Sequence, residues 1–167
     1  MSFLPFSLVY VNQDSPRKDW HPETQLCFVL SGSAQVILQN RSFPIQSEDV
    51  FLVNAGEIWE IAGSDWELLI LSFRQDLLPG SDQALTARFD LCSSGNTYST
   101  RFDCVRFCMA QLASLAVKKD PSFNNLSIFY GLYSHLLSNF AASPAQFSTT
   151  GEQNQARFLE IIRYINE

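Results

Sequence analysis

The chain has 167 residues with 46% hydrophobic and 17% charged residues, which suits one folded domain with an appendage and excludes a disordered protein. The net charge of −6 excludes a domain that itself holds DNA, because DNA binding needs a basic face to replace the phosphate counterions. No signal-peptide pattern opens the sequence and no apolar run reaches the length of a membrane helix, so we expect a soluble, cytoplasmic protein.

Up to about residue 91 the sequence consists of short β-rich runs separated by turn residues, among them Ser31-Gly32-Ser33 and Asn54-Ala55-Gly56. Strands at such close spacing favour a sandwich or barrel. Many runs are apolar at nearly every position, which indicates that both faces of a sheet are partly covered. We predict strands at Phe3–Tyr10, Thr24–Leu30, Ala34–Leu38, Ser42–Ile45, Val50–Val53, Ile58–Ile61, Glu67–Phe73 and Ala87–Leu91.

After residue 97 apolar residues recur every three or four positions, which indicates helices. Thr100 and Asp103 have the spacing of a capping box at the start of the first helix, and a second helix is predicted from about Leu126. The polar, proline-containing turn at residues 118–121 predicts an antiparallel hairpin. Both helices are apolar on more than one side, which on a small barrel indicates a second copy of the chain. We predict the dimer contact at Val105, Met109, Leu112, Phe129, Tyr133 and Leu136.

The sequence therefore divides into a barrel at residues 1–96, a helical dimerisation hairpin at 97–142, and a linker with the start of a further helix at 143–167. Thr149 and Glu152 suggest another capping box within the last part. The stripe of Phe158, Ile161, Ile162 and Ile165 that follows runs on without a stop signal. We expect the natural chain to continue past its last residue here.

Three stretches resemble AraC-type transcription regulators of bacteria. Residues 23–33 (ETQLCFVLSGS) resemble the first strand pair of the cupin domains in that family, and residues 47–56 (SEDVFLVNAG) are similar to its second motif. Residues 157–167 (RFLEIIRYINE) resemble the helix that leads into the family's helix-turn-helix domain. The resemblance covers the whole chain.

What this resemblance implies is a mainly β fold with α: a cupin-like β-barrel, or jelly roll, followed by an antiparallel helical hairpin and a terminal linker helix. The barrel would hold a small effector and the hairpin would make a homodimer. DNA would be bound only through a C-terminal domain outside this chain. Another interpretation is a barrel that has lost its ligand and only dimerises. Fold analogy alone does not decide between this interpretation and an effector-binding barrel.

Cupin enzymes bind a metal through three histidines and a glutamate, and the resemblance places Asp19, His21, Gln25 and Trp59 at those four positions. Only His21 is a conventional match; Asp19 could ligate, Gln25 is a poor ligand and Trp59 cannot ligate. We therefore expect no metal, no cofactor and no catalytic residue. A nucleophile elbow and phosphate-binding glycine loops are also missing, so an enzyme is not expected. The alternative is a small metal-dependent cupin isomerase or dioxygenase.

The same four positions are expected to point into the barrel, because side chains alternate between the faces of a strand. Trp59 would provide a flat apolar wall, and Asp19, His21 and Gln25 would provide hydrogen-bonding groups. This combination suits a sugar or similar polyol. Simple core filling by Trp59 and a satisfied rim histidine at His21 are equally compatible with the pattern. His135 is interpreted as a helical residue near an interface.

The four cysteines, Cys27, Cys92, Cys104 and Cys108, match no zinc-site spacing. We expect them to be free, buried thiols that act as small apolar residues. A thiol sensor would need an exposed cysteine with a lowered pKa.

Overall fold

The computed structural model describes residues 4–13, 18–39, 41–78, 87–96, 98–118 and 123–142. The predicted linker and terminal helix at 143–167 lie outside these residues. The strands are β1 (Phe6–Asn12), β2 (Lys18–Trp20), β3 (Thr24–Ser31), β4 (Ser33–Leu38), β5 (Arg41–Gln46), β6 (Val50–Val53), β7 (Ile58–Ala62) and β8 (Glu67–Phe73). The α-helices are α1 (Asp103–Val117) and α2 (Phe123–Phe140), with short 3-10 helices at Gln75–Leu77 and Thr100–Phe102.

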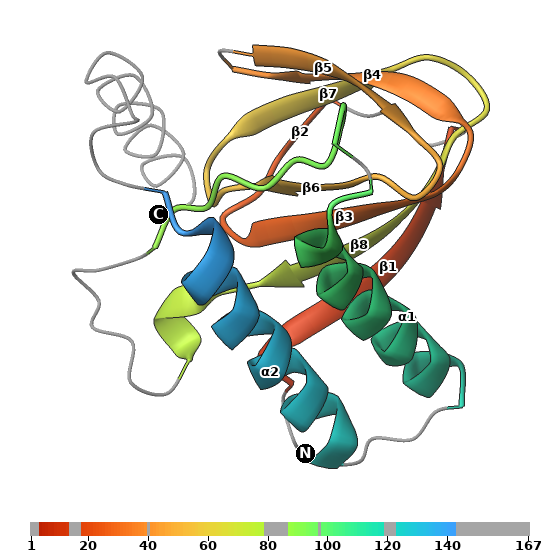
Figure 1. Cartoon of the computed structure of the whole chain (residues 1–167). Helices are drawn as coiled ribbons and strands as arrows, with labels where there is room; N and C mark the ends of the chain where they lie inside the picture. The colour runs from red at the N-terminus through yellow and green to blue at the C-terminus, as the bar shows by residue number, and fades with distance from the viewer. Residues whose placement is uncertain are drawn as a thin grey trace, which may run out of the picture.

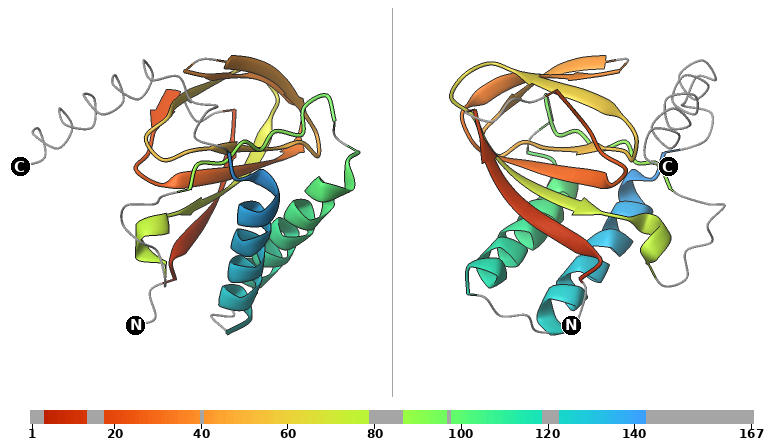
Figure 2. Two further views of the ribbon diagram at one scale, coloured as in Figure 1. Left: turned by 60° about the vertical axis from the view of Figure 1, so that its left-hand side comes forward. Right: turned by 180° about the vertical axis from the view of Figure 1, so that it is seen from behind.

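The eight strands form two antiparallel sheets with the orders β1-β8-β3-β6 and β2-β7-β4-β5. The two sheets face each other, and α1 and α2 cover the other side of the first one, which we call the helix-facing sheet (Figures 1 and 2). We call β2-β7-β4-β5 the outer sheet. The predicted fold class, mainly β with a helical hairpin after a jelly-roll barrel, is confirmed.

Strands β3, β6 and β8 of the helix-facing sheet are buried on both sides, and this explains their apolar sequences. In β8, Leu68 and Ile70 pack in the core between the sheets, whereas Leu69 and Leu71 pack in a second core beneath the helices. Alternation along the strand sends successive side chains into the two cores. The prediction that both faces of a sheet are partly covered is therefore confirmed.

Residues 87–96 differ from the predicted strand at Ala87–Leu91. They lie beside β6, but only isolated bridges join Phe51 to Cys92 and Phe89 to Ala141. Side chains of the second cupin-like motif supply further anchoring, because the buried Asp49 carboxylate accepts hydrogen bonds from Gln46 N (2.9 Å) and Ser93 Oγ (2.7 Å). This segment is held by individual polar groups more than by a continuous ladder.

The predicted capping box at Thr100 and Asp103 is wrong. Residues Thr100–Phe102 form a 3-10 turn, and no side chain caps the start of α1 at Asp103. The second helix begins at Phe123, three residues before the predicted start. Within the described parts of the chain, neither helix is long and apolar enough to cross a membrane.

Candidate functional site

The four predicted site residues form one continuous cluster. Asp19 of β2 pairs directly with Trp59 of β7, and directly opposed residues share a face of the sheet. Trp59 Nε1 donates a hydrogen bond to Gln25 Oε1 (3.1 Å), which links the outer sheet to β3. Asp19 Oδ2 lies 2.9 Å from His21 Nε2. The cluster therefore runs without a break from His21 to Gln25.

The Trp59 end of the cluster is buried. Trp59 is 1% exposed and packs edge-on against Phe51, with the ring centroids 5.9 Å apart. Gln25 is also buried, and its Nε2 donates to Ser72 Oγ (3.3 Å). In this conformation Trp59 fills the core, and the polar groups of Trp59 and Gln25 have partners within the chain. These two residues lie in the interior of the barrel, and they present no flat apolar wall to solvent.

The His21 end of the cluster is open to solvent. The side chains of Asp19 and His21 are 30% and 37% exposed. His21 Nδ1 lies 3.7 Å from Glu23 Oε2, so the imidazole is flanked by two carboxylates. Glu23 was not among the predicted site residues, although the alternation of Asp19, His21, Glu23 and Gln25 could have identified it. Carboxylates and an imidazole at this rim can accept and donate hydrogen bonds to a polar ligand.

The donor set of the cluster does not suit a metal ion. Gln25 and Trp59 bond to each other, which leaves Asp19 and His21 as the conventional ligands among the four positions. Across the described ranges, no group of three or more His, Cys, Asp or Glu side chains is arranged to hold a metal.

Five of the six residues predicted for the dimer contact are buried inside the chain itself. Val105, Met109, Leu112, Phe129 and Leu136 are at most 2% exposed and pack in the core beneath the helix-facing sheet. Tyr133 is half-buried, and its hydroxyl donates to Gln75 Oε1 (3.2 Å). These side chains have little or no surface left for a second copy. A dimer contact through the hairpin therefore has to use the side of the two helices that faces away from the sheet.

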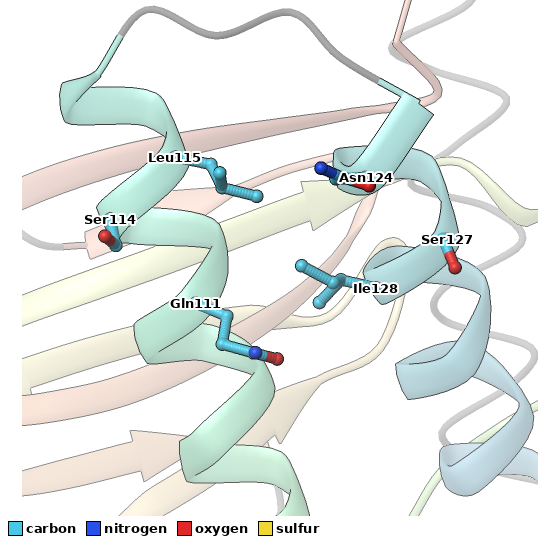
Figure 3. Close-up of a pocket in the computed structure, with 6 residues that line it drawn as sticks. All are labelled: Gln111, Ser114, Leu115, Asn124, Ser127 and Ile128. Carbon is cyan, nitrogen blue, oxygen red and sulfur yellow. The ribbon is translucent and has the colours of Figure 1, made fainter.

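That opposite side is grooved. A groove of about 400 Å³ lies between the two helices, where Leu115 and Ile128 point toward each other beside Gln111, Ser114, Asn124 and Ser127 (Figure 3). A second groove of about 430 Å³ lies along the other flank of α1, lined by Phe28, Glu48, Tyr98, Asp103, Arg106, Phe107 and Ala110. The outer face of α1 therefore forms a ridge between two hollows.

The cysteines fit the expected structural role in part. Cys27 is buried and Cys92 and Cys108 are half-buried, but Cys104 is exposed on α1. Burial, with a contribution from the neighbouring Cys104 thiol, raises the pKa of Cys108 to about 11, and burial also raises the pKa of Cys92. The Cys108 thiol is therefore protonated at neutral pH, which is the opposite of what a thiol sensor requires.

Comparisons with known proteins give one family and several similar folds. The model of the AraC-like ligand binding domain matches residues 4–118, which include the whole barrel and α1. No curated protein shows a significant match. Similar solved structures include a cupin protein from Bacteroides fragilis, at 12% identity over 50% of this chain and 75% of that chain with a TM-score of 0.37.

Two further structures have comparable scores. A Cupin 2 conserved barrel domain protein from Salinispora arenicola is 15% identical over 44% of this chain and 66% of that chain, with a TM-score of 0.36. An oxalate decarboxylase from Bacillus subtilis is 20% identical over 46% of this chain, with a TM-score of 0.37. The match spans only 23% of the length of the decarboxylase.

Proposed function

The chain belongs to the AraC-like ligand binding domain family, and we propose from this premise that it senses a small effector for a bacterial AraC-type transcription regulator. The observation that supports this proposal best is the polar cluster that leads from the exposed Asp19 and His21 to the buried Gln25 and Trp59. DNA would be bound by another part of the protein, because this chain is acidic. Such a regulator would act in the cytoplasm.

We place the effector at the exposed rim of this cluster, which Asp19, His21 and Glu23 form. Asp19 and Glu23 offer acceptors, and His21 offers a donor or an acceptor depending on its tautomer. A sugar or sugar derivative presents several hydroxyl groups that can use both kinds of partner. An apolar compound would leave the carboxylates desolvated and unpaired, which is costly.

The effector proposal is tested with Asp19→Asn. At millimolar concentration, at least one of D-glucose, D-galactose, D-ribose and maltose is expected to raise the melting temperature of the wild type, because ligands stabilise the state that they bind. Loss of a charged acceptor costs about 1–3 kcal/mol of binding, so Asp19→Asn should weaken the affinity roughly 5- to 150-fold. Differential scanning fluorimetry measures both effects.

Asp103→Asn is the matched control, because Asp103 is an exposed carboxylate that pairs with Arg106 at 2.8 Å on α1, away from the cluster. This variant should keep the full ligand-induced shift. If flat hydrophobic compounds stabilise the wild type and none of the sugars does, the polar effector is wrong. If Asp19→Asn and Asp103→Asn respond alike, the placement at the rim is wrong.

We propose that two copies pair through the outer face of the hairpin. The only charged residues of α1 are Asp103 and Arg106 near its start, and α2 has no Asp, Glu, Lys or Arg at all. Depletion of charge is typical of the centre of a protein interface. Gly131 lies exposed in the middle of α2, where a Cβ atom would meet nothing within 4 Å. A glycine there costs about 1 kcal/mol of helix stability relative to alanine, so close approach of a second backbone would explain it.

The dimer proposal is tested with Gly131→Leu. Within one copy the added side chain points into open space and improves helix propensity, so the isolated fold should be as stable or more stable. In the dimer the same side chain would hold the two helices apart. Analytical ultracentrifugation should show a dimer for the wild type and a monomer for Gly131→Leu.

Ala62→Leu adds similar bulk at an exposed position of β7 in the outer sheet, and it should remain dimeric. A wild type that sediments as a monomer at high concentration contradicts the proposal. A Gly131→Leu variant that stays dimeric would exclude this face of α2.

A further inference from the structure

The turn after β6, residues 54–57, is attached to the strand that carries the proposed effector site. Gly56 N donates to His21 O (2.8 Å), and Trp20 Nε1 donates to Gly56 O (3.1 Å). Gly56 has φ +77°, a conformation that favours glycine, so the position of this peptide is closely defined. A movement of His21 or Trp20 therefore acts directly on the turn.

The turn is braced internally, so it can move as one unit. Glu57 N donates to Asn54 O (3.0 Å), and Asn54 N donates to Glu57 Oε2 (2.8 Å). The Asn54 side chain is buried, and its Nδ2 lies 3.5 Å from the same carboxylate oxygen. These contacts connect the side chains of Asn54 and Glu57, which both reach from the turn to the segment that starts at residue 87.

Both of those side chains hold the segment that starts at residue 87. Asn54 Oδ1 accepts from Phe89 N (2.8 Å), and Asn54 Nδ2 donates to Phe89 O (3.0 Å). Glu57 Oε1 makes an ion pair with Arg88 Nη2 (2.9 Å), and both side chains are mostly screened from solvent. Asn54 thus binds both backbone groups of Phe89, as a neighbouring strand would.

The same segment holds the end of α2. Ala142 N donates to Arg88 O (2.8 Å), and Asp90 N donates to Phe140 O (2.9 Å). These two bonds frame the isolated bridge between Phe89 and Ala141. In Figure 1 the bright green segment runs beside β6 and meets the blue end of α2. The chain leaves the described fold at this point, on its way to residues 143–167.

We propose that the turn 54–57 couples the effector site to the exit of α2, by controlling how firmly residues 88–90 hold residues 140–142. The proposal deepens the proposed function, because it assigns a regulatory output to the same rim. Coupling requires an element with two arrangements that both sites can bias. We place this element at residues 88–90, because the backbone of Phe89 is held by the buried Asn54 side chain and by an isolated bridge to Ala141, and the Arg88 side chain is held by one ion pair.

Trp20→Phe tests this coupling without any ligand. It removes the indole N–H that holds Gly56 O and keeps an aromatic ring. Hydrogen exchange, followed by NMR on the whole 167-residue chain, reports the opening of individual hydrogen bonds. The amides of Asp90 and Ala142 should exchange about fivefold faster than in the wild type, and the amide of Leu71 in the sheet core should be unchanged.

Tyr10→Phe is the matched control, because it removes one aromatic donor, to Glu67 Oε1 at 2.7 Å, at a site with no connection to the turn. It should leave Asp90 and Ala142 unchanged. Glu57→Gln removes the charge that pairs with Arg88 and should speed exchange at the same two amides. In the double variant with Trp20→Phe, the two effects should then not multiply, since both act through one element.

Unchanged exchange at Asp90 and Ala142 in Trp20→Phe overturns the coupling, as does an equal increase in Tyr10→Phe. Fully multiplying effects of Trp20→Phe and Glu57→Gln also overturn it. A different result overturns the proposed effector, namely that no sugar raises the melting temperature of the wild type. The two proposals can therefore be accepted or rejected separately.

Discussion

Replacing Gly32 with alanine is expected to remove a large part of the stability of the protein. Gly32 joins β3 to β4 with φ +81°, and a Cβ atom added there would lie 1.6 Å from the backbone oxygen of Asp65. Asp65 lies in the short connection between β7 and β8. Its backbone oxygen cannot move aside as the end of a flexible side chain can. The expected cost is about 4 kcal/mol or more, a large part of the roughly 5–15 kcal/mol that stabilises a typical domain.

Gly95→Ala separates the steric clash from the cost of the backbone conformation. Gly95 has φ +77°, but an added Cβ meets nothing within 4 Å. Its substitution should therefore cost only the strain of a left-handed alanine, about 1–2 kcal/mol. Urea unfolding followed by circular dichroism compares the two variants with the wild type. Equal midpoints for Gly32→Ala and Gly95→Ala would show that the clash with Asp65 is relieved and the argument is wrong.

Trp59→Ala is expected to destabilise the barrel by about 3–5 kcal/mol, the usual cost of removing a large aromatic side chain from a core. The substitution opens a cavity beside Phe51 and removes the donor that satisfies Gln25 Oε1. A loss of ligand binding in this variant would therefore not show that the ligand touches Trp59. Urea unfolding gives the stability, and the melting-temperature shift with sugars gives the binding.

Trp59→Phe is the informative partner of that variant. It keeps a ring against Phe51 and removes the N–H bond to Gln25, so it should cost about half as much as Trp59→Ala or less. If the ligand lies at the rim, Trp59→Phe should retain binding. Unfolding of Trp59→Ala at the urea concentration that unfolds the wild type would contradict the core role of Trp59.

Much of the barrel could be predicted because its turns are marked in the sequence. Gly32 and Gly56 delimit strands that the structure places within one or two residues of the prediction. β2 was missed because three residues are too few for a periodic pattern. The segment beside β6 could not be anticipated, since its partners include the side chains of Asn54 and Asp49, which come from a distant part of the sequence.

The sequence predicted which residues of the candidate site lie near one another, but it did not predict how deeply each of them is buried. Strand alternation brings Asp19, Gln25 and Trp59 together, but only the packing of the two sheets shows that Trp59 and Gln25 are buried. The hairpin shows the same limit. Periodicity reveals that α1 has two apolar sides, and it cannot tell which of them the barrel occupies.

The core beneath the helices also makes the hairpin part of a single cooperative folding unit. Phe73 of β8 packs against Phe129 of α2, with the ring centroids 5.5 Å apart, and Leu26, Val50 and Leu71 of the sheet contribute to the same core. A fragment that ended at residue 96 would expose this apolar face to water and would be prone to aggregate. The boundary expected between residues 96 and 97 stays a prediction, and any ligand that stabilises the strands should also raise the thermal stability of the helices, because both contribute to this core.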